Sequence, residues 1–148
     1  MATNLARKTY IKSQLAVLFI DLDGFKQVND ALGHEVGDQV LQDVAHKLTQ
    51  NVRREDTLAR IGGDEFVLLV EDLDGLDQVK SLADKLVESI SNMHTPALKD
   101  VRIGASIGIA LYPDHGSDTR TLLVRADEAM YEARRQGKRC YFFYGADD

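Results

Sequence analysis

Two carboxylates that lie far apart in the sequence could meet and hold a metal ion. Asp21 follows an apolar run of strand type, and Asp64 stands at the tip of a predicted β-hairpin. If the two strands are neighbours in a sheet, these side chains converge at one end of it. Such oxygen ligands, with a backbone carbonyl such as that of Leu22, suit Mg²⁺, which takes the rest of its shell from water and substrate phosphates. The alternative is that Asp21 and Asp23 merely cap the helix that follows.

The segment after Asp21 could also bind phosphate. The chain opens a helix there, and the first N–H groups of a helix, here those of Phe25 and Lys26, have no partner within the helix. Such groups can receive phosphate oxygens. The segment therefore predicts an anion site next to the metal site.

The hairpin that carries Asp64 has glycine at its tip. Two apolar runs of strand type, Thr57–Ile61 and Phe66–Val70, flank Gly62 and Gly63. Glycine supplies the positive φ that tight primed turns require, so we expect such a turn here. Bare backbone at the tip would let a large group such as a phosphate chain approach closely. The alternative is an acidic turn at the surface.

Apolar periodicity predicts the elements that must position these residues. Alternating or continuous apolar runs indicate strands, and a 3.6-residue period indicates amphipathic helices. The expected strands are Leu15–Ile20, Thr57–Ile61, Phe66–Val70, Val101–Leu111 and Cys140–Tyr144. The expected helices run over about 24–32, 37–52, 76–93 and 118–136. Met1–Gln14 is interpreted as the tail of a helix, and 15–148 as a single domain.

This order of elements, β-α-α-β-β-α-β-α-β, predicts the fold class. Five strands that include a hairpin cannot all be parallel. We therefore expect an α+β fold, with a five-stranded mixed, mainly antiparallel sheet and packed helices, of ferredoxin-like type.

Composition limits the class of protein. The 148 residues are 44% hydrophobic and 28% charged, as in an ordinary globular domain. The net charge of −6 argues against a general nucleic-acid or membrane binder, because both partners are anionic. Cys140 is the single cysteine and has no partner for a disulfide or a metal site. No apolar run is long enough to span a bilayer and no secretory signal opens the chain, so we expect a cytoplasmic location.

Five blocks of the sequence resemble the GGDEF family, in the family's order. Gly62–Phe66 spells the family signature letter for letter. The blocks that are similar to other family motifs are Asp21–Asp30, Gly33–Asp38, Ser106–Ala110 and Ala126–Tyr131. The likeness covers about residues 15–144. It implies a palm-like nucleotidyl cyclase fold and diguanylate cyclase activity, in which two GTP are condensed into cyclic di-GMP and two pyrophosphates are released.

The resemblance also implies roles for individual positions. Asp21, the Leu22 carbonyl and Asp64 are expected to hold two Mg²⁺ ions, with Mn²⁺ as an alternative, and Glu65 is expected to assist catalysis beside them. The expected substrate contacts are Phe25, Lys26, Arg134 and Lys138 for phosphate, Asn29 and Asp38 for guanine, and Gly62 and Gly63 for the close approach of the nucleotide. The alternative for Arg134 and Lys138 is a pair of solvated cations at a helix end.

An inhibitory site is implied at Arg53-Arg54-Glu55-Asp56. Five residues separate Asp56 from the signature, which is the family's spacing for its Arg-x-x-Asp motif. The resemblance implies that Arg53 and Asp56 bind cyclic di-GMP away from the active site, with Lys85 as a further cation. The alternative is that Arg53 and Arg54 end a helix, where cations are favoured, and that Asp56 opens a loop.

The chain departs from the family pattern in three places. The usual opening block is missing, and Arg134 and Arg139 stand where the family usually has Lys and Asn. We therefore expect a domain cut from a longer protein with an upstream sensory module. Catalysis would need a homodimer, because one chain offers one nucleotide site. Two alternatives stay open, namely a non-catalytic receptor for cyclic di-GMP or GTP and a ferredoxin-like interaction module.

Overall fold

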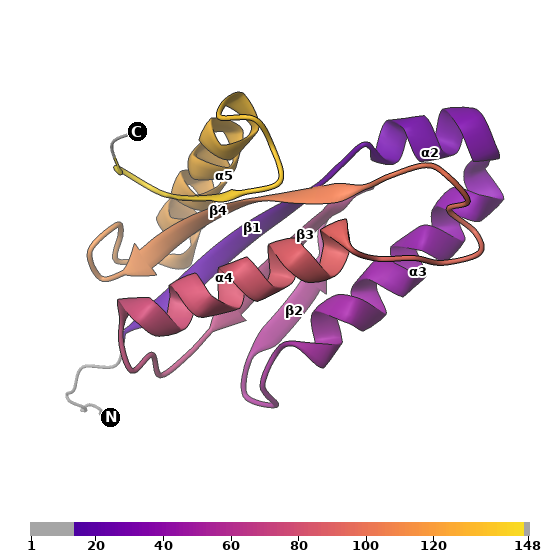
Figure 1. The fold of residues 1–148 in the computed structure, drawn as a ribbon. Coiled ribbons are helices and arrows are strands. Elements are labelled where there is room, and N and C mark those ends of the chain that lie inside the picture. Colours follow the sequence, from indigo (N-terminus) through magenta and orange to yellow (C-terminus); the bar gives the residue numbers. More distant parts are fainter. Residues whose placement is uncertain (1–13, 147–148) are drawn as a thin grey trace.

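The computed structural model describes residues 14–146, so the predicted helix tail over Met1–Gln14 lies outside the described residues except for Gln14. Within this range, five strands and four helices form an α+β fold (Figure 1). The strands are β1 (Leu15–Asp23), β2 (Thr57–Arg60), β3 (Glu65–Val70), β4 (Gly104–Tyr112) and β5 (Tyr141–Phe143). The helices are α2 (Phe25–Leu32), α3 (His34–Gln50), α4 (Leu76–Ser91) and α5 (Thr119–Arg135). The predicted order of elements is confirmed.

The strands form one sheet with the order β2-β3-β1-β4-β5. Strand β1 lies at the centre and is antiparallel to β3 on one side and to β4 on the other. Strand β2 is antiparallel to β3, and only the β4–β5 pair is parallel. The prediction of a mixed, mainly antiparallel, ferredoxin-like sheet is therefore confirmed.

Helices cover both faces of the sheet. Figure 1 shows α5 on one side of the sheet and α4 on the other, with α3 beside α4. The larger core packs α2, α3 and α4 against one face, through residues such as Leu18, Phe66 and Ile107. The smaller core packs α5 against the other face, through residues such as Phe19 and Met130. Both faces of the central strand are therefore buried, as its continuous apolar run predicts.

Strand β1 is longer than predicted. We expected it to end at Ile20, with Asp21 and Asp23 just beyond, but both acids lie inside the strand. The reason is the neighbouring strand, because β4 pairs with β1 as far as Asp23 opposite Gly104. Residues two apart in a strand share a face, so both carboxylates point toward the α5 side of the sheet.

Other boundaries differ by a few residues. Helix α3 begins at His34 rather than near Gly37, because Gly33, with φ of 94°, both ends α2 and precedes α3. Strand β4 begins at Gly104 rather than Val101. The sequence offers Ser117 or Asp118 as the cap of the last helix, and the structure decides for Asp118, whose side chain accepts from the Thr121 N–H at 2.8 Å. Among the described residues, none of the helices combines the length and apolarity needed to cross a membrane.

Candidate active site

The register of the sheet brings the predicted metal ligands together. Asp21 lies opposite Glu65 of β3 and opposite Ser106 of β4. The Leu22 N–H donates to the carbonyl oxygen of Asp64 at 3.2 Å, which ties the hairpin tip to the end of β1. Asp64 and Glu65 are half-buried beside the buried Asp21. The prediction that the two distant acids converge at one end of the sheet is confirmed.

The surroundings of Asp21 disfavour its charged form. It is only 4% exposed, and its burial, followed by the charge of Asp64, raises its pKa from 3.8 to about 6. Arg134 opposes this rise, since its Nη1 donates to Asp21 Oδ2 at 2.6 Å. The other oxygen, Asp21 Oδ1, is buried without a hydrogen-bond partner among residues 14–146. An unpartnered carboxylate oxygen is costly in the fold and open to a cation.

Asp23, two residues further along, is in the opposite situation. Its Oδ1 accepts from the Ser106 hydroxyl at 2.7 Å, and its Oδ2 accepts from the Arg139 N–H at 3.0 Å. Both oxygens are therefore engaged by the fold, and Asp23 ties β1 to β4 and to the segment after α5. Neither Asp21 nor Asp23 caps the next helix, because no side chain caps α2.

The residues present fit a divalent metal ion. No cluster of three or more His, Cys, Asp or Glu side chains suited to a metal occurs within the described part of the chain. The predicted set is smaller: the free Oδ1 of Asp21, the Asp64 carboxylate and the Leu22 carbonyl. A set of this size suits Mg²⁺, which binds through one or two carboxylates and keeps several waters for exchange with phosphate oxygens.

Close packing of α5 on the sheet brings Arg134 to Asp21. A Cβ at Gly108 of β4 would lie 2.0 Å from the Ala126 carbonyl oxygen and 2.1 Å from the Met130 nitrogen. Only glycine at this position allows the helix to lie so near the strand. Arg134 follows Met130 by one turn, and its side chain therefore reaches the end of β1.

Lys138 does not share a helix face with Arg134, although the two are four residues apart. Helix α5 ends at Arg135, and Gly137, Lys138 and Arg139 all have positive φ values of 125°, 66° and 52°. Two consecutive non-glycine residues in the left-handed region are unusual and mark strain that often accompanies function. Lys138 is exposed, and its N–H donates to the Ala133 carbonyl at 3.1 Å, so it belongs to the turn that closes α5. The alternative of two solvated cations at a helix end therefore stays open.

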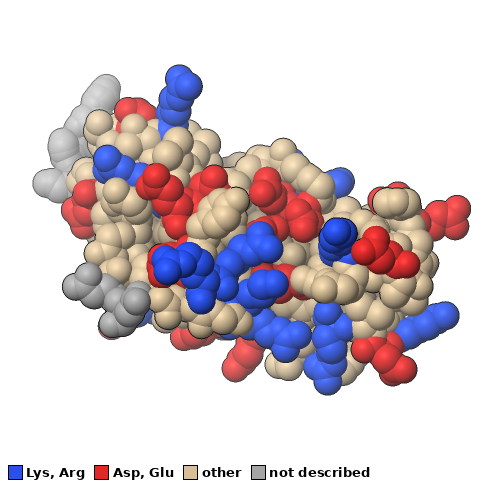
Figure 2. Space-filling view, turned by 90° about the horizontal axis from the view of Figure 1, so that it is seen from above, with Lys and Arg blue, Asp and Glu red and all other residues tan. Residues whose placement is uncertain are grey.

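A pocket of about 380 Å³ lies beside the start of α2. Three cations line it, namely Arg102, Lys138 and Arg139. Gly24, which precedes the helix, and Gln27, in its first turn, line it as well. Figure 2 shows lysine and arginine side chains gathered next to acidic ones in the middle of one face of the molecule. Cations and uncapped N–H groups around one pocket form a setting for phosphate. Arg102 belongs to none of the sequence motifs, so sequence reasoning missed it.

The two residues predicted to read guanine lie close together. A Cβ at Gly37 would be 1.9 Å from Asn29 Oδ1, so α2 and α3 are in contact there. Asp38, the next residue, is exposed at the start of α3. Gly37 thus allows Asn29 to pack against the first turns of α3, where Asp38 is the next residue in the chain.

The hairpin tip is wider than predicted. Neither Gly62 nor Gly63 has a positive φ, so the expected tight primed turn is wrong. Ile61 donates its N–H to the Glu65 carbonyl at 3.0 Å, which leaves a longer loop between β2 and β3. A Cβ at Gly63 would meet nothing within 4 Å. The tip therefore has the open, bare backbone that the sequence predicted, for a different conformational reason.

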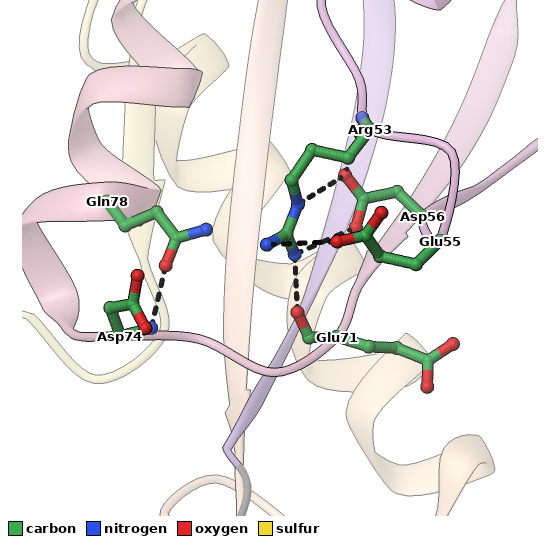
Figure 3. Close-up of polar contacts among 6 residues, drawn as sticks. All are labelled: Arg53, Glu55, Asp56, Glu71, Asp74 and Gln78. Carbon is green, nitrogen blue, oxygen red and sulfur yellow. Dashed lines mark hydrogen bonds and ion pairs between the residues drawn. The ribbon is translucent and has the colours of Figure 1, made fainter.

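The predicted inhibitory residues line one separate pocket of about 210 Å³, which includes Arg53, Asp56 and Lys85. Figure 3 shows Arg53 folded onto Asp56, with both Asp56 oxygens accepting from its side chain at 3.1 and 3.3 Å. Arg53 also donates to the Glu71 carbonyl and lies 3.5 Å from Glu55. The hydrogen bonds to Asp56 raise the pKa of the Arg53 guanidinium. Arg53 lies three residues beyond the end of α3, and its guanidinium pairs with Asp56 and the Glu71 carbonyl. The alternative of a helix-end cation is not tested by these contacts.

Comparison with known proteins identifies the family of this chain. Residues 1–140 match the family described as diguanylate cyclase, GGDEF domain. The chain belongs to the GGDEF family. The palm-like cyclase fold that the motifs imply is confirmed, since the similar solved structures are GGDEF domains.

Curated relatives of this GGDEF domain are much longer proteins. The chain is 53% identical over 131 residues to the bifunctional diguanylate cyclase/cyclic di-GMP phosphodiesterase MucR of Pseudomonas aeruginosa. It is 46% identical over 132 residues to the diguanylate cyclase TpbB of the same species. These matches cover 88% and 86% of this chain but only 19% and 29% of the relatives. The enzyme class that the family and its relatives carry is diguanylate cyclase.

Solved structures of GGDEF domains superpose closely on this one. The isolated GGDEF domain of TpbB from Pseudomonas aeruginosa is 41% identical with a TM-score of 0.84, and the match covers 89% of this chain and 77% of that one. The GGDEF domain of DgcB from Caulobacter crescentus, solved in complex with c-di-GMP, has a TM-score of 0.79 at 24% identity, covering 90% and 80%. At that identity the second match supports the fold alone.

Proposed function

We propose that this GGDEF domain condenses two GTP into cyclic di-GMP with release of two pyrophosphates. The observation that carries the proposal is the intact acidic site: Asp21, with one buried oxygen left open, lies beside Asp64 and Glu65 at the hairpin tip. Degenerate family members that only bind ligands typically lose the acidic signature, which this chain keeps. Family membership and the names of the relatives support the same reaction.

Asp21, the Leu22 carbonyl and Asp64 are the groups that would hold divalent metal, two Mg²⁺ per site or Mn²⁺ in their place. When bound, Mg²⁺ supplies positive charge that polarises the α-phosphate and offsets the charge of the leaving pyrophosphate. Glu65 lies opposite Asp21 in the register, where it can accept a hydrogen bond from the attacking 3′-hydroxyl. These residues orient the reacting groups, which is the main contribution of protein to phosphoryl transfer.

The remaining residues bind the nucleotide. The uncapped N–H groups of Phe25 and Lys26 and the cations Arg134 and Lys138 would bind the phosphates. The support is that no side chain caps α2 and that Lys138 lines the pocket beside the start of that helix. Asn29 and Asp38 would bind the guanine edge, because a carboxylate can accept from both N1–H and the amino group of guanine, which adenine cannot match. The open backbone at Gly63 leaves room for the nucleotide against the hairpin, whereas a Cβ at Gly62 would lie 2.9 Å from Glu65 Oε1. Gly62 would therefore give room to the Glu65 carboxylate.

Incubation of the domain with Mg²⁺ and GTP, followed by chromatography, tests the proposal. Cyclic di-GMP should form, and Asp64→Asn should abolish it while the thermal unfolding curve stays in place. The variant keeps the shape of the hairpin because the bond from Leu22 goes to the backbone carbonyl of residue 64. Binding of GTP without product would support the receptor alternative, and the absence of both would support the interaction module.

Catalysis requires two copies of this domain. Each GTP must attack the α-phosphate of the other, so two sites must face each other across a two-fold axis. Specific activity should therefore rise with protein concentration across a dilution series that begins with monomers. A flat dependence would contradict the dimeric mechanism.

We also propose product inhibition at the pocket that Arg53, Asp56 and Lys85 line. The support is that the Arg53 side chain is already held in place. It donates to Asp56 and to the Glu71 carbonyl, which fix the guanidinium in one orientation. Binding of guanine or phosphate would therefore cost little side-chain entropy. Calorimetric titration with cyclic di-GMP should show strong loss of affinity in Arg53→Ala and no change in Arg54→Ala, a neighbouring exposed cation. Equal affinity in wild type and Arg53→Ala would contradict the proposal.

A further inference from the structure

The ion pair between Arg134 and Asp21 differs from the other ion pairs of residues 14–146. Arg53 and Arg135 pair with acids at most three positions away. Arg134 instead reaches across 113 positions to the buried carboxylate at the end of β1. Its own side chain is 40% exposed, whereas the side chain of Asp21 is 6% exposed. A half-exposed cation thus covers Asp21, the carboxylate that has a buried oxygen without a hydrogen-bond partner among residues 14–146.

The geometry of this pair leaves the site available. Arginine and carboxylate commonly pair as two parallel hydrogen bonds that engage both oxygens. Here a single nitrogen, Nη1, contacts Oδ2, and Oδ1 has no partner within the described part of the chain. A pair built only for stability would engage both oxygens, because an unpartnered buried oxygen costs free energy. The arrangement instead compensates the charge of Asp21 and keeps one oxygen open.

Neighbouring charge explains why a compensating cation is needed. Asp64, Glu65 and Asp23 all lie close enough to Asp21 to disfavour its charge. Asp23 accepts hydrogen bonds from Ser106 and Arg139, whereas the side chain of Asp21 has Arg134 as its single polar partner among the described residues. Without a cation of some kind, this end of the sheet would hold several carboxylates in mutual repulsion.

We propose that Arg134 is an exchangeable counter-cation for Asp21, which holds the carboxylate in the metal-free domain and yields it when a divalent ion binds. The inference rests on the proposed function for the identity of the ion, and it adds a competition between an arginine of the chain and the metal. Two cations on one carboxylate repel each other, so metal binding drives the guanidinium off Oδ2. The released side chain is then free to contact phosphate.

The fold allows this exchange without moving a helix. The contacts of Gly108 with the backbone of α5 fix the helix on the sheet, so only the side chain of Arg134 must turn. The pocket beside Lys138 and Gly24 offers an anion-binding surface near the end of the same helix. A single arginine could thus couple metal entry to phosphate binding.

The competition predicts that removal of Arg134 strengthens metal binding. Mn²⁺ alone, without nucleotide, is titrated into the domain at pH 8 and followed by electron paramagnetic resonance. Arg134→Ala should bind Mn²⁺ roughly fivefold more tightly than the wild type, the factor expected for loss of one competing ion pair of about 1 kcal/mol. Arg134→Lys keeps the charge and should stay near the wild type.

Three controls accompany this titration. Arg135→Ala removes a neighbouring cation that pairs with Glu132 instead, and should leave the Mn²⁺ affinity unchanged. Asp21→Asn should abolish the binding, which assigns the measured site. If Arg134→Ala does not fold by circular dichroism, Arg134→Gln, which keeps most of the side-chain stem, replaces it.

The direction of the effect separates exchange from a structural role. A residue that only supports the site would weaken Mn²⁺ binding when removed. Unchanged or weaker binding in Arg134→Ala, or no binding in any variant, would overturn the proposal. In a second measurement, with Mn²⁺ at saturating concentration, GTP should bind more weakly to Arg134→Ala than to the wild type, and equal affinities would overturn the transfer to phosphate.

The cyclase assay keeps this inference distinct from the proposed function. A wild-type domain that makes cyclic di-GMP, combined with unchanged Mn²⁺ affinity in Arg134→Ala, would defeat the exchange alone. A domain that makes no product but binds Mn²⁺ fivefold more tightly after Arg134→Ala would support the exchange and defeat the cyclase assignment.

Discussion

Replacement of the buried carboxylate of Asp21 by an amide should stabilise the metal-free domain while removing its response to metal. Burial and the charge of Asp64 raise the pKa of Asp21 from 3.8 to about 6. That rise corresponds to a cost of about 3 kcal/mol for the charged form at neutral pH. An uncharged amide at this position would avoid the cost, although a buried amide with imperfect partners takes back about 1 kcal/mol or more. The net gain for Asp21→Asn is therefore about 1–2 kcal/mol.

The gain should depend on pH in a defined direction. The pKa of Asp21 is higher in the folded state, because of burial, than in the unfolded chain. Asp21 therefore does not destabilise the fold below pH 3.8, where it is protonated in both the folded and the unfolded state. As the pH rises from 3.8 to about 6, the folded domain loses stability, because the unfolded chain releases this proton more readily. Thermal unfolding in EDTA should show Asp21→Asn melting roughly 2–8 °C above the wild type at pH 8. Near pH 4 the charge cost is almost gone and the amide penalty remains, so the difference should disappear or reverse.

Asp23→Asn is the matched control, two residues away on the same face of the same strand. Both oxygens of Asp23 accept hydrogen bonds, from Ser106 and from the Arg139 N–H. The amide can keep both contacts only if the Ser106 hydroxyl turns to accept, which takes that hydroxyl's proton away from its buried acceptor and removes the charge from both bonds. This variant should melt below the wild type at pH 8. Added Mg²⁺ should raise the melting temperature of the wild type and leave that of Asp21→Asn unchanged. An Asp21→Asn variant that is no more stable than the wild type at pH 8, or whose gain persists at pH 4, would refute the reasoning.

Three further measurements test packing, specificity and pH dependence. Gly108→Ala should destabilise the domain by about 1–3 kcal/mol, because its methyl group would overlap the backbone of α5. Gly63→Ala, whose methyl group meets nothing, should melt like the wild type and lose turnover. Equal melting of the two variants would contradict the packing argument. If Asn29 and Asp38 bind guanine, kcat/KM should be at least about 100-fold lower for ATP than for GTP, and equal turnover would contradict the assignment. Burial lowers the pKa of His115, so the wild type should lose stability relative to His115→Asn as the pH falls below about 6.5, and parallel pH curves would count against it.

The sequence alone predicted most of the architecture of this domain. The order of elements, the mixed sheet and a cap at Ser117 or Asp118 follow from local patterns, because apolar period and turn residues report the local conformation directly. The meeting of Asp21 with Asp64 also followed, once their strands were taken as neighbours. Boundaries were less accurate, as in β1, because a strand ends where its partner ends and the partner is remote in sequence.

The conformation of the hairpin tip could not be read from its glycines. Gly62 and Gly63 permit positive φ but do not require it, and the tip adopts a wider loop instead. The contacts of Arg53 could not be predicted from the sequence either. Its partner in the segment that follows β3 is the Glu71 carbonyl, a backbone atom that no side-chain pattern can indicate.

The family resemblance named Asp21 as the metal ligand, but only the tertiary structure supplies the physical reason why Asp21, and not Asp23, keeps an oxygen without a partner among the described residues. Asp21 and Asp23 are equivalent in sequence, two acids at the end of one apolar run. Ser106 and Arg139, 83 and 116 positions away, engage both oxygens of Asp23, while Arg134 engages one oxygen of Asp21. Hydrogen bonds between segments so far apart depend on how α5 packs on β4. Local sequence fixes the presence of the acids, and long-range packing fixes which of them keeps a free oxygen.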